Sequence, residues 1–123
     1  MKWQNDIILD QALNYIKNNV TQLCICNAQP TTYTEAVATF KLALKTGMTA
    51  DSFTGPADGN TNGRKLTINN QTNVNVDSNG TAIYIALCSD TVLLYVTTCT
   101  SQVLTAGNTV TIPAWKIEIA DPT

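Results

Sequence analysis

The stretch that decides the fold is residues 81–99, TAIYIALCSDTVLLYVTTC, in which two runs of aliphatic, β-branched and aromatic residues flank Ser89-Asp90. Two such runs separated by a pair of turn-forming residues are typical of a β-hairpin. A two-residue turn would pair Leu87 with Val92. This pairing predicts one continuous aliphatic face, which we expect in the core and which consists of Ile83, Ile85, Leu87, Val92, Leu94 and Val96.

The opposite face of the same hairpin is also largely apolar. It would pair Ala86 with Leu93, Tyr84 with Tyr95, and Ala82 with Thr97. A strand pair that is apolar on both faces lies at the centre of a sheet or is covered by another element. We therefore predict a homo-oligomer whose interface includes Tyr84, Leu93 and Tyr95.

Further strands are predicted on both sides of this hairpin. Towards the C-terminus, alternation of apolar and polar residues predicts strands at 64–68, 72–76 and 115–119, and a second hairpin of 102–105 with 109–112 around Gly107-Asn108. Towards the N-terminus, 22–26 and 39–45 are strand candidates, and 47–63 is a long polar loop. We expect a mainly β fold, an antiparallel, jelly-roll-like β-sandwich with two sheets packed face to face.

Residues 6–20 carry the one clear helical pattern. Asp6 is a candidate N-cap, and one apolar stripe recurs at helical spacing: Ile8, Leu9, Ala12, Leu13, Ile16 and Val20. We expect this stripe to dock on the chain's own sheet; the alternative is that it packs on a neighbouring subunit. The helix and the strands form a single domain of residues 6–123, preceded by an N-terminal arm of residues 1–5.

The composition narrows the class of function. Charged residues make up 13% of the 123 residues, the net charge is −2, and there is no histidine. No basic run favours nucleic-acid binding, and no apolar segment is long enough to span a bilayer or to act as a signal peptide. No nucleophilic triad, Walker motif or dinucleotide fingerprint occurs. We therefore expect a protein made in a cytoplasm that is not an enzyme, with no catalytic residue, no cofactor, and no nucleic-acid or membrane partner.

Two sets of residues resemble parts of metal sites but lack the full ligand pattern. Cys24, Cys26, Cys88 and Cys99 lack the spacing of a zinc knuckle, so we expect them to be reduced and to serve as small apolar side chains. Residues 58–63, DGNTNG, match the first half of a calcium loop, but the twelfth position is Asn69 in place of the bidentate glutamate. This pattern favours a polar turn over a calcium site, and we predict no bound metal.

A wider resemblance covers nearly the whole chain. It rests on residues 10–16 (DQALNYI), 24–36 (CICNAQPTTYTEA), 58–59 (DG), 63–68 (GRKLTI), 96–102 (VTTCTSQ), 112–115 (IPAW) and Asp121-Pro122. In these stretches the sequence resembles small virion proteins of tailed bacteriophages. The resemblance implies a non-enzymatic particle component that decorates or cements the capsid shell, with the major capsid protein or other virion proteins as partners. Decoration proteins often lie on local three-fold axes, which favours a homotrimer.

Two alternatives stay open. One is a neck or tail component of the same particle. The other is a module that binds a carbohydrate or a host-surface molecule, which a groove lined by Trp3, Tyr33 and Trp115 would favour. For the decoration role, we expect the contacts with the shell to come from the arm, through Trp3, and from the loop of residues 47–63, because large aromatic side chains dominate interface energetics.

Overall fold

The computed structural model describes residues 2–123 and is mainly β, with one α-helix near the N-terminus, as predicted. Met1, the first residue of the predicted arm, lies outside the described residues. The helical elements are α1 (Asp6–Asn19), the π-helical turn η1 (Glu35–Thr39) and the 3-10 turn η2 (Ala50–Ser52). The strands are β1 (Gln22–Cys26), β2 (Lys41–Lys45), β3 (Phe53–Asp58), β4 (Arg64–Ile68), β5 (Gln71–Asn75), β6 (Gly80–Cys88), β7 (Leu93–Leu104), β8 (Thr109–Ile112) and β9 (Trp115–Ile119).

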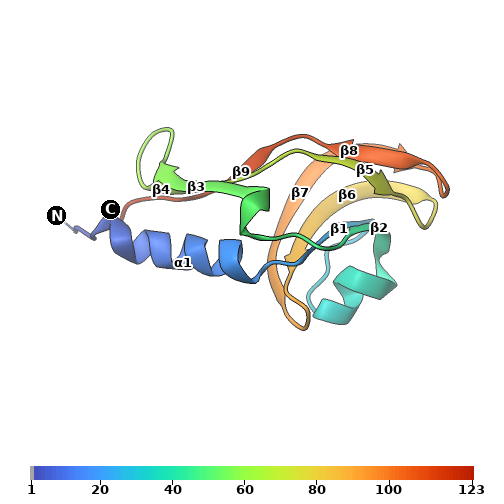
Figure 1. Cartoon of the computed structure of the whole chain (residues 1–123), viewed down its shortest axis with the longest axis horizontal. Helices are drawn as coiled ribbons and strands as arrows, with labels where there is room; N and C mark the ends of the chain where they lie inside the picture. Colours follow the sequence, from blue (N-terminus) through green and yellow to red (C-terminus); the bar gives the residue numbers. More distant parts are fainter. Residues whose placement is uncertain (1) are drawn as a thin grey trace.

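The strands form three antiparallel sheets, where two were predicted. Their orders are β2-β1-β6-β7, β3-β4-β9 and β5-β8. The two smaller sheets are joined end to end, because β4 runs into β5 and β8 runs into β9 with short breaks at Asn69-Asn70 and Pro113-Ala114. We call this pair of interrupted strands the long ribbon; it extends along the molecule in Figure 1. Proline has no N–H to donate to a ladder, so Pro113 marks one break.

The half of the long ribbon made by β5 and β8 closes one side of an incomplete barrel. A bridge between Ala43 and Val76 links β2 to β5, and the N–H of Asp77 donates to the carbonyl of Leu42 at 2.8 Å. Strands β7-β6-β1-β2-β5-β8 therefore follow one another around the main core. No pairing joins β7 to β8 in the described chain, and this leaves an open seam between them.

The other half of the long ribbon packs against α1, which lies under β3 and β4 in Figure 1. Leu9 and Leu13 are buried and Ile16 packs on the core, so the helix docks on its own chain as expected. Two details differ from the prediction. The N-cap is Asn5, whose side chain accepts from the N–H of Ile7, and Ile8 and Ala12 are exposed. The docking face consists of Leu9, Leu13 and Val20, which are buried, and Ile16, which is partly buried; the predicted stripe included two exposed residues.

The predicted register of the central hairpin is wrong. The turn has four residues, 89–92, because the Ser89 hydroxyl accepts from the N–H groups of Thr91 and Val92. The turn pairs Cys88 with Leu93 and leaves Val92 exposed. Extra residues in β7 then shift the register twice, and the first shift pairs Leu87 with Tyr95 and not with Val92. Of the predicted core, Ile85 and Leu87 are buried and Leu94 packs on the core, whereas Ile83 is half-buried and Val96 belongs to a second cluster.

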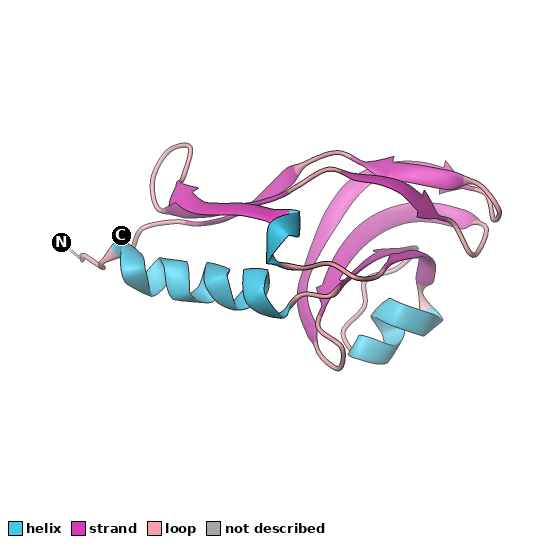
Figure 2. Ribbon diagram, viewed as in Figure 1, coloured by secondary structure: helices cyan, strands magenta, loops and turns pink. Residues whose placement is uncertain are grey.

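The hairpin is apolar on both faces, as predicted, but the chain itself supplies the cover. Residues 27–40 fold back over the outer face, and Figure 2 shows the short helical turn of this segment beside the sheet. A second buried cluster forms beneath it: Cys24, Cys26, Ala36, Ala86 and Cys88, with Tyr33, Val37, Phe40, Leu44, Tyr84, Leu93 and Val96 packed around them. The need for a partner's cover, which motivated the interface prediction for Tyr84 and Leu93, is therefore met within the chain.

Two other predicted segments differ from the structure. Residues 47–63 are not one loop: they contain η2 and β3, and the side chains of Met48 and Phe53 are buried. Gly55-Pro56 hid this strand, since both residues disfavour a regular ladder. The predicted hairpin of 102–105 with 109–112 is absent from the described ladders, because 102–104 continue β7 while β8 pairs with β5. The predicted strand 39–45 begins at Lys41, after η1.

Candidate binding groove

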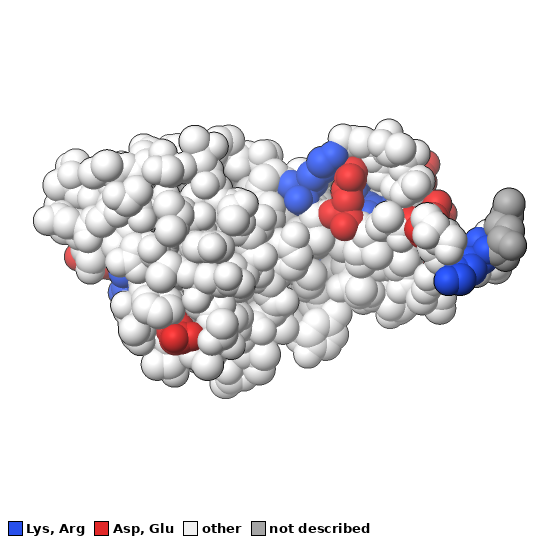
Figure 3. All heavy atoms as spheres, turned by 180° about the vertical axis from the view of Figure 1, so that it is seen from behind, with Lys and Arg blue, Asp and Glu red and all other residues white. Residues whose placement is uncertain are grey.

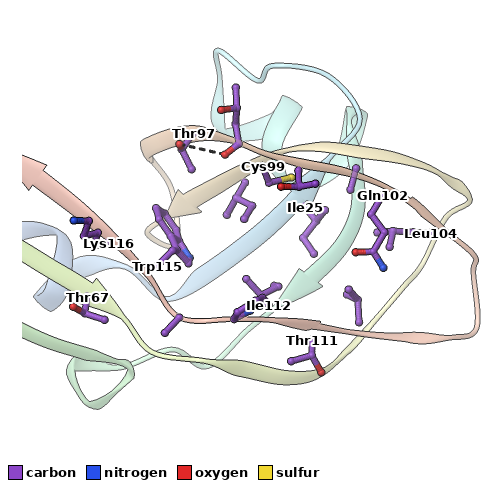
Figure 4. A pocket seen from close by; sticks show the side chains of 17 residues that line it. Ile25, Thr67, Thr97, Cys99, Gln102, Leu104, Thr111, Ile112, Trp115 and Lys116 are labelled. Atoms are coloured by element: carbon purple, nitrogen blue, oxygen red, sulfur yellow. Dashed lines mark hydrogen bonds between the residues drawn. The ribbon is translucent and has the colours of Figure 1, made fainter.

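The open seam forms a groove of about 850 Å³. Its two banks are the exposed edge of β7 and the edge formed by β8 and β9 (Figure 4). Core side chains form its floor, among them Ile25, Ile85 and Ile112. The turn at 105–108 joins β7 to β8 at one end, and the two strands run unpaired from there. The groove therefore exists because the barrel does not close.

The lining of this groove is largely apolar and almost uncharged, with polar side chains along its banks. Hydroxyl and amide side chains alternate along its banks, contributed by Thr67, Thr97, Thr98, Thr100, Gln102 and Thr111. Lys116 is the one charged residue among the lining residues. Cys99 also lines the groove, and partial burial raises the pKa of its thiol. Such a surface offers hydrogen bonds and apolar contact to a neutral occupant and little attraction to an ionic one.

Trp115 is the aromatic side chain in the groove. Its ring stacks on Tyr95, with ring centroids 6.1 Å apart and an interplanar angle of 30°. Its indole Nε1 is buried and has no hydrogen-bond partner. A buried donor without an acceptor costs about 1–3 kcal/mol, so an occupant that presents a carbonyl or hydroxyl oxygen there would recover that energy. Trp115, a lining residue of the groove, thus carries one buried, unmet donor.

The β7 bank is an open strand edge of 12 residues. Its sequence, LLYVTTCTSQVL, contains neither a charged residue nor a proline. Natural sheets commonly protect an edge with lysine, proline, a bulge or a covering element, because unpaired N–H and C=O groups recruit other strands. Here the two register shifts against β6 are the devices present. The edge is therefore uncharged but irregular, and these register shifts are its protection against pairing with a further strand.

A second surface lies at the opposite end of the molecule, around the arm and α1. Among residues 2–123, six large hydrophobic side chains are exposed, and four of them lie between residues 3 and 15: Trp3, Ile7, Ile8 and Tyr15. Trp3, the predicted anchor, is 79% exposed and lies near Asp121 and Pro122, so the two ends of the chain are neighbours. We call these four side chains the arm-helix patch.

The predicted interface residues are not brought together. Trp3 belongs to the arm-helix patch, whereas Tyr84 and Leu93 are half-buried under residues 27–40, and Tyr95 packs on the main core beside Trp115. The three aromatics that would mark a sugar-binding groove are also dispersed. Trp115 lines the groove, whereas Tyr33 packs on the second buried cluster, where its hydroxyl accepts from the side-chain amide of Gln22 at 2.9 Å.

The segment 58–63, considered as half a calcium loop, is the turn between β3 and β4. Its oxygens are engaged by neighbours: the Asp58 carboxylate pairs with Arg64 at 2.7 Å, and the Asn60 side chain accepts from Lys65 at 3.0 Å. The Asn62 side chain accepts from the N–H of Asp121. Among residues 2–123, no group of three or more acidic, cysteine or histidine side chains converges. The segment is a polar turn that ties the strand ends together.

The cysteines are free thiols, and three of them are buried. Burial raises the pKa of Cys26 to about 12. A hydrogen bond with Cys88 is the largest cause that raises the pKa of Cys24, and burial adds to it. The thiols of Cys24 and Cys26 therefore stay protonated, and all three buried cysteines pack among apolar side chains, as the sequence predicted.

Comparisons with known proteins add no family assignment: no protein-family model, curated protein or solved structure matches the chain. Within the described residues, none of the helices has the length and apolar character needed to cross a membrane. The groove at the seam and the arm-helix patch are thus the two candidate contact surfaces of the molecule.

Proposed function

We propose that the chain is a non-enzymatic structural protein of a tailed-bacteriophage particle, which decorates or cements the capsid shell through its arm-helix patch. The observation that carries the proposal is the concentration of exposed large side chains on the first fifteen residues. Soluble proteins seldom expose several such side chains together unless the surface meets a partner. The resemblance of the sequence to small virion proteins supplies the kind of partner, the major capsid protein or another shell component.

Other features at the arm end of the molecule also support binding to a capsid shell. The turn between β3 and β4, the helix start and both chain ends lie together at one end of the molecule (Figure 1). This brings the tip of the predicted 47–63 contact segment close to the arm, although most of that segment is β3. In Figure 3, charged side chains gather towards this end, while the sheet end of that face is nearly uncharged. A mixed apolar and charged end suits a specific but modest contact, which repetition on a lattice strengthens.

The test is binding to particles that lack the protein. Trp3→Ala removes the largest exposed side chain and leaves Asn5, the helix cap, intact. Deleting residues 1–5 is a poorer choice, since loss of a cap costs about 1 kcal/mol of helix stability and confuses the result. Val92→Ala is the matched control, because Val92 is 51% exposed but lies in the hairpin turn, away from the patch.

We expect intact protein and Val92→Ala to sediment with capsids and to protect them from heat, and Trp3→Ala to bind at least tenfold more weakly, as for loss of an aromatic anchor worth about 2 kcal/mol. Equal binding by all three proteins would rule out the patch as the anchor. Association with purified tails and not with capsids would replace the cement role by the neck or tail alternative.

One observation favours the second candidate, recognition of a carbohydrate or host-surface molecule. The unpartnered indole N–H of Trp115 lies in a groove rich in hydroxyl groups, where a sugar oxygen would accept from it. Binding of neutral oligosaccharides by intact protein, lost in Trp115→Phe, would support this candidate. The dispersal of Trp3 and Tyr33 from the groove makes it the weaker of the two.

A further inference from the structure

The outer edge of β9 is regular and unpaired. Strand β9 pairs with β4 through five consecutive residue pairs, from Trp115 to Ile119, without a register shift. It stands last in the order β3-β4-β9, and within residues 2–123 no ladder forms on its other side. In contrast to the bulged edge of β7, this edge presents an uninterrupted row of backbone N–H and C=O groups to another strand.

The charges of β9 identify the occupant of this edge. When two copies of one strand pair antiparallel, opposed side chains point to the same face, so the two-fold axis passes through a residue. An axis at Lys116 would oppose two lysines, and an axis at Glu118 would oppose two glutamates, which destabilises a strand pair. An axis at Ile117 instead sets Lys116 of each copy against Glu118 of the other. In this register the edge is complementary to itself.

The same register also matches the two faces of the strand. Ile117 is buried, and Trp115 and Ile119 on the same face pack on the main core. Lys116 and Glu118 are on the other face, where their side chains already pair along the strand at 3.0 Å. About Ile117, Trp115 would face Ile119 of the other copy, which is a favourable aromatic and β-branched pair. Exposed ion pairs contribute little, so the charges determine the register, and the backbone hydrogen bonds and apolar pairs supply the stabilisation.

The helix α1 carries a second unpartnered surface on the side of β9. Asp10 accepts from Arg64 of β4 at 2.8 Å. Lys17, on the same flank of the helix, donates to the carbonyl of Gly55 in β3 at 2.8 Å, so this flank lies on the β3 side. Since the sheet order is β3-β4-β9, the other flank faces the side of β9. That flank is apolar and exposed, and consists of Ile8, Ala12 and Tyr15.

Tyr15 lies close to the level of the proposed axis. Asp10 is held at the level of Ile119, because Ile119 pairs with Arg64. Both chain ends lie at one end of the molecule, so α1 and β9 run in opposite directions (Figure 1). Five helical residues from Asp10 to Tyr15 advance about 7.5 Å, and two strand residues from Ile119 back to Ile117 span about 6.6 Å. In a pair about Ile117, the Tyr15 side chains of the two copies would therefore approach each other beneath the sheet.

We propose that β9 pairs antiparallel with β9 of a second copy of this chain around a two-fold axis at Ile117. The two three-stranded sheets then form one sheet of six strands, with both α1 helices on the same face. This association goes beyond the proposed function and does not depend on it, since it needs no particle and leaves Trp3 free. It makes a dimer in place of the trimer that the resemblance implied, because an edge complementary to itself is satisfied by one partner.

The register allows a charge-swap experiment. Lys116→Glu opposes two glutamates on each side of the axis, and Glu118→Lys opposes two lysines. The double variant K116E/E118K restores opposite charges across the axis and along the strand. Lys45→Glu, in β2, is the matched control, because it makes the same change of charge as Lys116→Glu away from this edge. Circular dichroism and urea unfolding check that every variant is folded.

Light scattering over a range of concentrations measures the outcome. We expect intact protein, Lys45→Glu and K116E/E118K to show twice the 13.3 kDa chain mass. Each single variant at the edge should dissociate at about tenfold higher concentration or be a monomer, because like charges are opposed twice. A monomeric intact protein, a trimer, or dimers that survive both single variants unchanged would overturn the proposal. Loss of the dimer in the double variant as well would overturn the register at Ile117.

The helix provides an independent readout of the axis. Tyr15→Glu places two carboxylates near each other between the helices, so it should weaken the dimer. Ile7→Glu is the control, since Ile7 is 61% exposed and Tyr15 59%, but Ile7 lies on the side of α1 that faces away from the sheet. Equal dimer stability in these two variants would contradict the placement of the helices across the axis. Trp3→Ala, which tests capsid binding, should remain a dimer, so this proposal and the proposed function fail separately.

Discussion

Arg64 of β4 holds Asp10 of α1 through two hydrogen bonds, 2.8 Å from Nε to Oδ1 and 3.3 Å from Nη2 to Oδ2. A guanidinium and a carboxylate in this forked arrangement fix orientation as well as distance. The hydrogen bond with Asp10 is also the main cause that raises the pKa of Arg64. The contact joins the helix to the long ribbon, beside the apolar line of Leu9 and Leu13 that docks the same helix.

Removing the charge of Asp10 should loosen this helix. We expect Asp10→Asn to lower the midpoint of urea unfolding more than Asp58→Asn does. Both carboxylates bind the same guanidinium, but the side chain of Asp10 is 21% exposed and that of Asp58 is 90% exposed. Exposed ion pairs contribute little because water screens them. Equal midpoints for the two variants would show that the fork does not hold the helix.

Gly63 is required in the turn between β3 and β4. Its φ is +70°, and a Cβ added there would collide with the backbone oxygen of Ile119. Gly47 has nearly the same φ, +71°, but open space around it. Gly47→Ala should therefore cost only the left-handed conformation, about 1–2 kcal/mol in the free energy of unfolding. Gly63→Ala should cost more, and comparison of the two by chemical denaturation isolates the collision; similar losses would argue against it.

Two surface carboxylates should make the stability of the folded protein depend on pH in the acid range. The N–H of Thr31 donates to Glu35, and the N–H of Asn60 donates to Glu118, and these bonds lower the pKa of each carboxyl below its usual 4.5. A lowered folded pKa means that the stabilisation is complete above pH 4.5 and is lost as the pH falls through the folded pKa.

We therefore expect the melting temperature of intact protein to fall more steeply below pH 4.5 than that of Glu35→Gln/Glu118→Gln. Between pH 6 and 8 both carboxyls are ionised, so the two proteins should show parallel, flat profiles there. Parallel profiles throughout the acid range would mean that neither hydrogen bond favours the ionised carboxylate in the folded protein.

The four thiols should differ in reactivity in the folded protein. Cys99 is half-buried at the groove, while Cys24, Cys26 and Cys88 are sealed under residues 27–40. Since reaction needs an accessible thiolate, we expect a thiol reagent to modify Cys99 first and the other three only on unfolding. Mass spectrometry of the native protein should show one adduct, absent in Cys99→Ser, and four adducts in denaturant. Early modification of Cys24 or Cys88 would contradict the burial.

The local patterns of the sequence predicted most of the elements but not their pairing. Composition and alternation located β1, β4, β6 and β9 to within a residue or two, since those signals lie inside each strand. The hairpin register failed because the Ser89 hydroxyl builds a four-residue turn that resembles a two-residue one in sequence. β3 was hidden by Gly55-Pro56, and residues 27–40 carry too little periodicity to reveal that they cover a sheet.

The candidate groove was beyond the reach of local patterns. It exists because β7 and β8 do not pair, although one short turn joins them. The local sequence, two strand-like runs around Gly107-Asn108, instead predicts a hairpin there. One signal was nonetheless present in the sequence. Residues 93–104 form a strand of 12 residues that carries no charge. Strands at the edge of a sheet usually carry charged residues that discourage pairing, so the absence of charge is unusual for an edge strand.

The long ribbon has a mechanical consequence. Its strands run along the molecule from the arm end to the seam end, so a pull between the two ends acts nearly parallel to the strands (Figure 1). Under such a load the hydrogen bonds between the strands are sheared together, and rupture requires many to break at once. A pull across the strands would instead open them one by one. We therefore expect the fold to resist extension most strongly along the line that connects its two candidate contact surfaces.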